Sequence, residues 1–175
     1  MPKHLANLSF DFDAMSALIA RGMKTPTAIS RGEFGAVAVP RILKVLDRYN
    51  IKASFFIPGL TLETYPNVVE AIVKAGHEVG HHGWTHIPPA NLNQGEEEEH
   101  LVRGNELIEK MTGQKARGYR SPAWDLSDET VGLLLKHGFL YDSSMMGHDW
   151  MPYRARTGDV IHDDKGMEFG QETSL

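Results

Sequence analysis

Residues 51–80 read IKASFFIPGLTLETYPNVVEAIVKAGHEVG and predict one strand–helix–strand unit. Residues 51–58 form a short, apolar and aromatic segment, which is typical of a buried strand. Apolar residues recur at helical spacing over 67–76, and Gly76 predicts the end of that helix. Residues 77–80 then predict a second strand, which leads into a loop rich in histidine.

The same alternation extends over the rest of the chain. Further strands are predicted at 5–13, 116–122 and 139–144, and further helices at 40–50, 95–113 and 128–138. Regular alternation predicts an α/β domain in which parallel strands are covered by helices. A closed eight-stranded barrel usually needs about 250 residues, and this chain has 175. We therefore expect one domain over residues 1–175 whose C-terminal part is missing.

The sequence also makes predictions about the first turns of two helices. Pro40 suits the first turn of the helix over 40–50, because proline lacks an N–H that the first turn leaves unpaired. The four glutamates at 96–99 predict a solvated first turn that faces a favourable helix dipole.

The composition excludes several classes of site and partner. The chain is 41% hydrophobic and 23% charged, which is enough for one domain with its own core. The net charge of −5 and the absence of a Lys/Arg run argue against nucleic acid and acidic membranes as main partners. Because the chain has no cysteine, any metal must be held by histidine and carboxylate side chains.

The N-terminal residues 1–14 lack the uninterrupted apolar run of a signal peptide. No segment approaches the roughly 20 apolar residues of a membrane span. These observations predict a cytoplasmic protein without a membrane partner. They leave the oligomeric state open, a homo-oligomer included.

The predicted strand ends carry the residues that suggest chemistry. Asp11 and Asp13 lie two apart on a strand, so both carboxylates should point to the same side. His82 and His86 follow the third strand and offer neutral imidazole nitrogens that suit a borderline divalent ion. Two histidines and one aspartate leave coordination positions open, which is the pattern of a catalytic metal site. We therefore expect a divalent metal here, with zinc as the first choice.

Structural roles compete with this interpretation. A single aspartate at a strand end is more often a turn cap, and an isolated H-x-x-x-H is about as often a surface loop as a metal site. His81 is expected to be an exposed or supporting neighbour of the site. Arg120 could be a surface cation or could point inward and pair with Asp11. Trp84, Trp124 and Trp150 could be core residues, but their Gly- and Pro-rich surroundings favour the lining of a cleft.

At these residues the chain resembles the polysaccharide deacetylase family of metal-dependent carbohydrate esterases. SFDFDA (9–14) is similar to its first motif, and EVGHHGWTH (78–86) resembles its H-[ST]-x-x-H motif, with Gly83 in place of the hydroxyl residue. YRSPAW (119–124) resembles its R-x-P motif, and HDW (148–150) resembles a later D-x-W-like motif. The likeness spans about residues 5–160 and extends to a subgroup of peptidoglycan-deacetylase-like and allantoinase-like proteins.

The resemblance implies a distorted (β/α) barrel with fewer than eight strands, and it implies roles for individual residues. Asp11 would be the general base, held by Arg120. The implied metal ligands are Asp13, His82 and His86, and the implied substrate-binding residues are Trp84, Trp124, Asp149 and Trp150. The family's general acid, a C-terminal histidine, has no match, because His162 lies in a different sequence context.

The resemblance implies a hydrolase that cleaves carbon–nitrogen bonds outside peptides. An N-acetyl sugar polymer is the first candidate substrate, and a cyclic amide, imide or ureide is the alternative. A non-catalytic carbohydrate-binding module on the same scaffold stays open, since the general acid is unmatched. In each case the partner is a small molecule or a carbohydrate.

Overall fold

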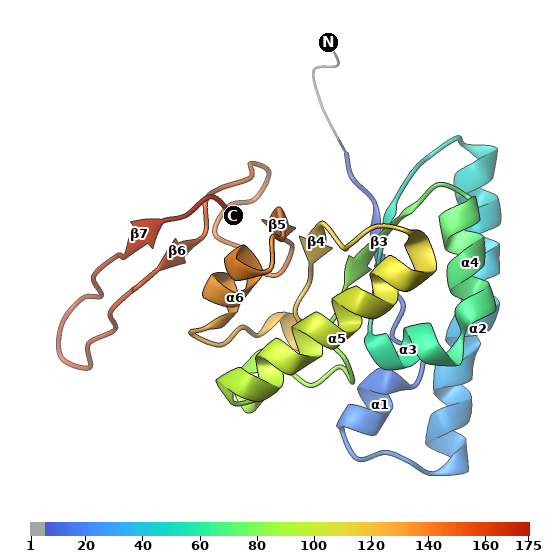
Figure 1. Ribbon diagram of the computed structural model, residues 1–175, viewed down its shortest axis with the longest axis horizontal. Coiled ribbons are helices and arrows are strands. Elements are labelled where there is room, and N and C mark those ends of the chain that lie inside the picture. The colour runs from blue at the N-terminus through green and yellow to red at the C-terminus, as the bar shows by residue number, and fades with distance from the viewer. Residues whose placement is uncertain (1–5) are drawn as a thin grey trace.

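Five parallel strands form a curled half-barrel at the centre of the computed structural model, which describes residues 6–175 (Figure 1). The strands are β1 (Ser9–Asp11), β2 (Ser54–Ile57), β3 (Glu78–His81), β4 (Gly118–Tyr119) and β5 (Tyr141–Asp142). They pair in sequence order, so β1 and β5 are the two edges of this sheet. The predicted α/β class, with parallel strands joined through helices, is therefore confirmed.

Helices cover the outside of the half-barrel (Figure 1). They are α1 (Ser16–Ala20), α2 (Pro26–Arg48), α3 (Gly59–Thr64), α4 (Pro66–Lys74), α5 (Gln94–Thr112) and α6 (Thr130–Lys136), with short 3-10 turns η1 (Pro89–Asn91) and η2 (Pro122–Trp124). Local sequence fixes the ends of α5. Asn93 and Glu96 form a reciprocal capping box at its start, and Gly113 ends it in the left-handed conformation, as predicted.

The predictions for two elements were inaccurate. The strand predicted over 5–13 is shorter, and its first residue, Leu5, lies outside the described residues. The helix predicted to begin at Pro40 begins instead at Pro26, after Thr25, whose hydroxyl accepts the N–H of Ala28. Pro26 and Pro40 both suit the first turn of a helix, but only Pro26 follows a residue whose side chain can cap the helix. Helix α2 continues through Pro40, which lies exposed on its surface.

The glutamate run at the start of α5 is not uniformly solvated. Glu97 is 2% exposed, and its carboxylate accepts hydrogen bonds from the hydroxyls of Ser127 and Thr130, both at 2.6 Å. Helical geometry places one residue of such a run on the inner face, where it needs partners. Glu97 therefore joins α5 to the start of α6.

The core lies between the convex face of the sheet and its helices. Alternate residues of β2, Phe55 and Ile57, are fully buried there, together with Val69 and Ile72 of α4. The other side chains of β2 face the concave side, where Phe56 lies beneath the guanidinium of Arg120. The sheet thus has one apolar face for stability and one concave face that can carry polar groups.

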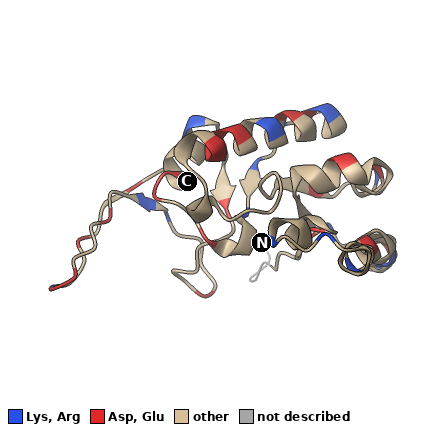
Figure 2. Cartoon of the chain, turned by 90° about the horizontal axis from the view of Figure 1, so that it is seen from below, with Lys and Arg blue, Asp and Glu red and all other residues tan. Residues whose placement is uncertain are grey.

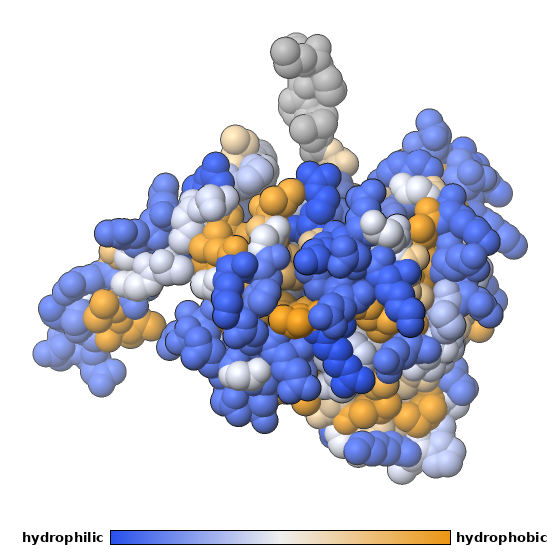
Figure 3. All heavy atoms as spheres, in the orientation of Figure 1, coloured by the Kyte–Doolittle hydropathy of each residue, from blue (hydrophilic) through white to orange (hydrophobic). Residues whose placement is uncertain are grey.

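The tail after Asp149 lacks sequence periodicity but contains an antiparallel hairpin. Its strands β6 (Arg156–Thr157) and β7 (Gln171–Glu172) extend away from the sheet in Figure 1. The hairpin exposes apolar side chains, among them Ile161 and Phe169 (Figure 3). Figure 2 shows that the helices carry both Lys/Arg and Asp/Glu positions. Among residues 6–175, no helix combines the length and apolar character that crossing a bilayer requires.

Ile72→Ala tests this assignment of the core. The substitution removes a side chain that is fully buried in α4, so it should lower the free energy of unfolding by about 2–5 kcal/mol. Val45→Ala is the control, because Val45 is 54% exposed on α2 and its truncation should change stability by less than about 0.5 kcal/mol. Urea unfolding of both variants gives the comparison, and equal losses would contradict the assignment.

Candidate active site

The carboxyl ends of β1 and β3 bring the first aspartates and the histidine loop together. Asp13 lies two residues after the end of β1, and the Phe12 N–H, which donates to the Phe56 carbonyl at 2.9 Å, extends the strand pairing as far as Phe12. His82 follows β3 in the same way. Because parallel strands end at one edge of their sheet, segments that are distant in sequence meet there.

Asp13, His82 and His86 form a compact three-residue cluster. Asp13 Oδ1 lies 3.4 Å from His82 Nε2, and Asp13 Oδ2 lies 3.3 Å from His86 Nε2. One ligand atom from each residue lies within 4.8 Å of the others. The two rings meet edge to face with their centroids 4.9 Å apart. The predicted trio therefore converges on one point.

A backbone hydrogen bond fixes the tautomer of His82. Its Nδ1 lies 2.6 Å from the carbonyl oxygen of Arg120, which can only accept. The proton of a neutral ring must then be on Nδ1, which leaves a lone pair on Nε2 directed toward Asp13. This is the arrangement by which a second contact orients a metal-ligating histidine.

The loop that carries His86 uses unusual backbone conformations. Gly83 has φ +71°, and a Cβ at this position would lie 2.9 Å from Pro122 Cγ. The left-handed backbone and the nearby proline explain why glycine replaces the family's hydroxyl residue at this position. His86 itself has φ +61°, which is uncommon for a non-glycine residue. Such a conformation persists only where the surrounding structure enforces it.

Burial and charge act in opposite directions on the ionisable groups of the cluster. Burial raises the pKa of Asp13, but contact with His86 and the charge of His82 outweigh it, so the pKa lies below its ordinary value. Burial lowers the pKa of His82 below its ordinary value, although Asp13 opposes the shift. An ionised Asp13 beside a neutral His82 is the protonation state that a divalent cation requires.

Arg120 orients the second aspartate, Asp11. The Arg120 Nη1 donates to Asp11 Oδ1 at 2.6 Å. Its Nη2 donates to the hydroxyls of Ser9 at 2.8 Å and Ser143 at 2.7 Å. The guanidinium stacks on Phe56, 4.2 Å from the ring centroid. Of the two roles considered from the sequence, the structure places Arg120 inward and paired with Asp11.

The cluster fits a metal ion by its unpaired atoms and by its donor set. Among residues 6–175, Asp13 Oδ1 and His82 Nε2 are buried without a hydrogen-bond partner. A buried nitrogen lone pair beside a carboxylate oxygen is unfavourable unless a cation lies between them. Two imidazole nitrogens with one carboxylate are a donor set that suits zinc.

The predicted substrate-binding residues lie in different environments. Trp84 is buried against Gly59, beneath the guanidinium of Arg103 at 3.6 Å, which suits packing rather than a groove wall. Trp124 is 54% exposed and has φ +58°. Trp150 is 83% exposed, and the neighbouring Asp149 pairs with His148. Trp124, Asp149 and Trp150 are thus accessible, whereas Trp84 is not.

Other residues support the site from outside the trio. Of the two roles considered for His81, exposed or supporting, the structure shows the second: His81 is completely buried, and its Nδ1 accepts the N–H of Gly83 at 3.1 Å. A Cβ at Gly104 of α5 would overlap the His81 ring, so glycine permits this close approach. Ser9 and Ser143 are ordinary strand residues in the sequence, and no local pattern marks them as partners of Arg120.

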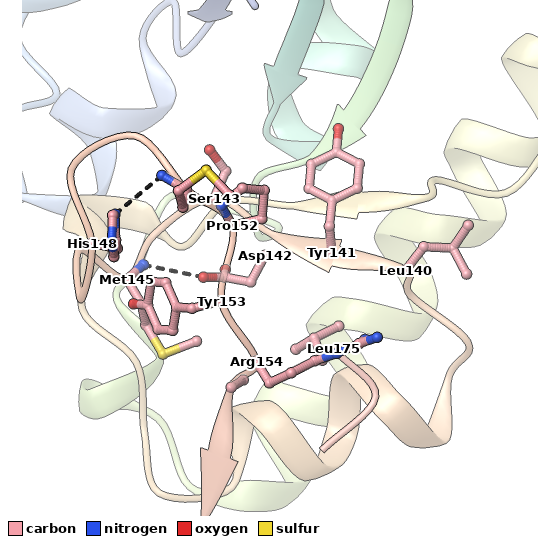
Figure 4. A pocket seen from close by; sticks show the side chains of 12 residues that line it. Leu140, Tyr141, Asp142, Ser143, Met145, His148, Pro152, Tyr153, Arg154 and Leu175 are labelled. Carbon is pink, nitrogen blue, oxygen red and sulfur yellow. Dashed lines mark hydrogen bonds between the residues drawn. The ribbon is translucent and has the colours of Figure 1, made fainter. Parts of the chain in front are cut away.

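A hollow of about 630 Å³ lies along β5 (Figure 4). Tyr141, Asp142 and Ser143 line one side of it, and His148 and Tyr153 line the loop side. Asp142 has a structural role, because its carboxylate accepts hydrogen bonds from the Met145 N–H and from the N–H and hydroxyl of Ser144. Ser143 connects this hollow with Arg120, so the edge of the half-barrel adjoins the candidate active site.

The polysaccharide deacetylase family model matches residues 29–141. The chain belongs to the polysaccharide deacetylase family. The matched range includes His82, His86 and Arg120, whereas Asp11 and Asp13 precede it. A peptidoglycan deacetylase from Helicobacter pylori is 43% identical over 152 residues, which cover 85% of this chain and 52% of that protein. Family membership thus agrees with the resemblance inferred from the motifs.

Solved structures place this polysaccharide deacetylase family member among (β/α) barrels. A Mycobacterium smegmatis protein assigned to the polysaccharide deacetylases has a TM-score of 0.78 and 36% identity, covering 92% of this chain and 55% of that one. A CE4 family pseudoenzyme from Bacillus anthracis has a TM-score of 0.63 and 26% identity, covering 78% and 41%. The chain spans about half the length of the curated relatives it matches, 52% and 49% for two of them.

We expect this deacetylase-family domain to become less stable as the pH falls, because His81 is buried in its neutral form. Burial, with a smaller contribution from the neighbouring His82, lowers the pKa of His81 to about 3. Below the ordinary histidine pKa of about 6.5, the unfolded chain gains a proton that the folded chain does not. The contribution of neutral His81 is therefore complete above about pH 6.5 and is lost as the pH falls toward 3.

Urea unfolding at pH 7.5 and pH 4.5, with a chelator present, measures this contribution. In His81→Asn the amide oxygen can replace Nδ1 as the acceptor, but the side chain no longer titrates. The variant should lose less stability between the two pH values than the wild type does. An equal loss in both proteins would contradict the role of His81.

Proposed function

We propose that this domain is a metal-dependent hydrolase that removes acetyl groups from N-acetyl amino sugars in a polysaccharide of the peptidoglycan class. The convergence of Asp13, His82 and His86 beside the Arg120–Asp11 pair is the observation that supports it. The name of the Helicobacter pylori relative supports the choice of substrate class.

Asp13, His82 and His86 would hold the metal, and we propose zinc from the nitrogen and oxygen donors. When bound, the ion supplies Lewis acidity, which lowers the pKa of a water at the site toward neutrality and polarises the amide carbonyl. The hydrogen bond from His82 Nδ1–H to the Arg120 carbonyl holds that ring in the tautomer that can act as a ligand.

Asp11 is proposed as the general base. The Arg120 guanidinium binds Oδ1, so the carboxylate is oriented and its other oxygen can accept the proton of the attacking water. The departing nitrogen then needs a proton. Asp11 holds one at that stage, and we assign it the return of this proton to the leaving group. His162 is not proposed as the donor, because it pairs with Glu168 on the hairpin at 3.0 Å.

Trp124, Asp149 and Trp150 are proposed to contact the carbohydrate. Exposed aromatic rings offer flat apolar surfaces with a polar edge, which suit the faces of a sugar ring. Trp84 is left out of this set, because it is buried against Gly59.

Two other functions correspond to known relatives. An allantoinase structure has a TM-score of 0.72 but only 22% identity, so it supports the shared fold and no particular substrate. The Bacillus anthracis relative is described as a pseudoenzyme, and a mutant of it as having restored enzymatic activity. A non-catalytic binding module is therefore the second candidate.

Acetate release and bound zinc, measured together, test the proposal. The zinc-loaded wild type should release acetate from oligomers of N-acetylglucosamine. Asp13→Ala should lose both zinc and activity, because it removes a ligand. Asp11→Asn should keep its zinc but lose about 100- to 10,000-fold in rate, as expected for removal of a general base.

Asp128→Asn is the matched control: Asp128 lies exposed just before α6, so the variant should retain both zinc and turnover. Undiminished acetate release by metal-free protein would refute the proposal. Ring opening of allantoin without acetate release would favour the cyclic-amide alternative, and zinc binding without turnover of either compound would favour the binding module.

A further inference from the structure

Helix α3 contacts both segments that carry the candidate metal ligands. One segment contains Asp13 and follows β1, and the other contains His82 and His86 and follows β3. The first turn of α3, Gly59–Thr61, lies after β2, the strand between these two. Its position in the sheet therefore places it where it can bind both segments.

The backbone of this turn binds the histidine loop. The Gly59 N–H donates to the Gly83 carbonyl at 3.0 Å, and the Leu60 N–H donates to the Trp84 carbonyl at 2.9 Å. The first amides of a helix have no partner within the helix, so these bonds satisfy them. The Trp84 ring packs so closely on Gly59 that a Cβ there would overlap it. The loop from Gly83 onward is thus fixed to α3.

The Thr61 side chain binds the aspartate segment. Its hydroxyl donates to the backbone carbonyl of Asp13 at 2.6 Å, and the Ser16 hydroxyl donates to the same oxygen at 2.7 Å. Both hydroxyl side chains are completely buried. The next residue, Ala14, has φ +48°, so the chain turns sharply just after the ligand. A carbonyl held by two buried donors fixes the direction from which the Asp13 side chain projects.

We propose that Thr61 is a positioning residue for the metal site, and that α3 couples the aspartate segment to the histidine loop. The inference rests on the proposed function, because it assigns a role toward the ligands of that site. Thr61 does not touch the ligand atoms. It acts through the Asp13 backbone. The neighbouring amides of Gly59 and Leu60 hold the loop that carries His82 and His86 in place relative to Asp13.

Zinc affinity, measured by competition with a chromophoric chelator, tests the role of Thr61. Thr61→Val keeps the shape of the side chain but removes its donor, so it should weaken zinc binding by about tenfold or more, as outer contacts of metal ligands do. Thr61→Ser restores the hydroxyl and should stay within about threefold of the wild type. Thr130→Val is the control: it removes an equally buried hydroxyl, which serves Glu97, and should leave zinc affinity unchanged.

Hydrogen exchange of the metal-free proteins gives a readout that does not depend on zinc. Thr61→Val should accelerate amide exchange in the segment around Asp13–Ser16, whereas Thr130→Val should not. Unchanged zinc affinity together with unchanged exchange in folded Thr61→Val would overturn the inference. If the wild type binds no zinc, the proposed function fails, and the exchange result alone then decides whether α3 holds the Asp13 segment.

Discussion

The site depends on one electrostatic constraint: the Asp13 carboxylate faces two imidazole nitrogens across less than 3.5 Å. The Arg120 carbonyl holds the proton of His82 on the far side of its ring, so the near nitrogen offers a lone pair. A lone pair and a carboxylate oxygen, both buried, repel one another without a cation. Contacts from residues outside the cluster hold Asp13, His82 and His86 in this arrangement. Those contacts are the physical reason to regard the cluster as a candidate metal-binding site.

Arg120 gives the half-barrel a second constraint. Its guanidinium reaches Ser9 and Asp11 at one edge of the sheet and Ser143 at the other. One cation on the concave face thus contacts both edge strands while it orients the candidate base. The group that would serve catalysis also links β1 to β5, so its loss should affect architecture and chemistry together. For this reason the sharper functional variants are at Asp11 and Thr61.

The sequence was sufficient to predict the parts that follow from periodicity and strand ends. Alternating strands and helices predicted the parallel sheet, and parallel strands that end at one edge predicted that Asp13 would meet His82. The start of α2 was missed because Pro40 also fits a first turn, and only the N-cap at Thr25 distinguishes the true start. The burial of Glu97 was missed because its partners, Ser127 and Thr130, lie about 30 residues further along the chain, just before and at the start of α6. No pattern in the sequence marks Thr61 as a supporting residue, because the Asp13 carbonyl that it binds belongs to a segment distant along the chain.

The family includes named deacetylases and a described pseudoenzyme on the same scaffold, so activity on this fold depends on the residues of the site. The central claim is that Asp13, His82 and His86 share one metal ion. X-ray diffraction from crystals grown with zinc, recorded on both sides of the zinc absorption edge, tests it most directly. The account predicts one anomalous peak within coordination distance of all three side chains. A peak at another position, or none while the three side chains keep this arrangement, would contradict it.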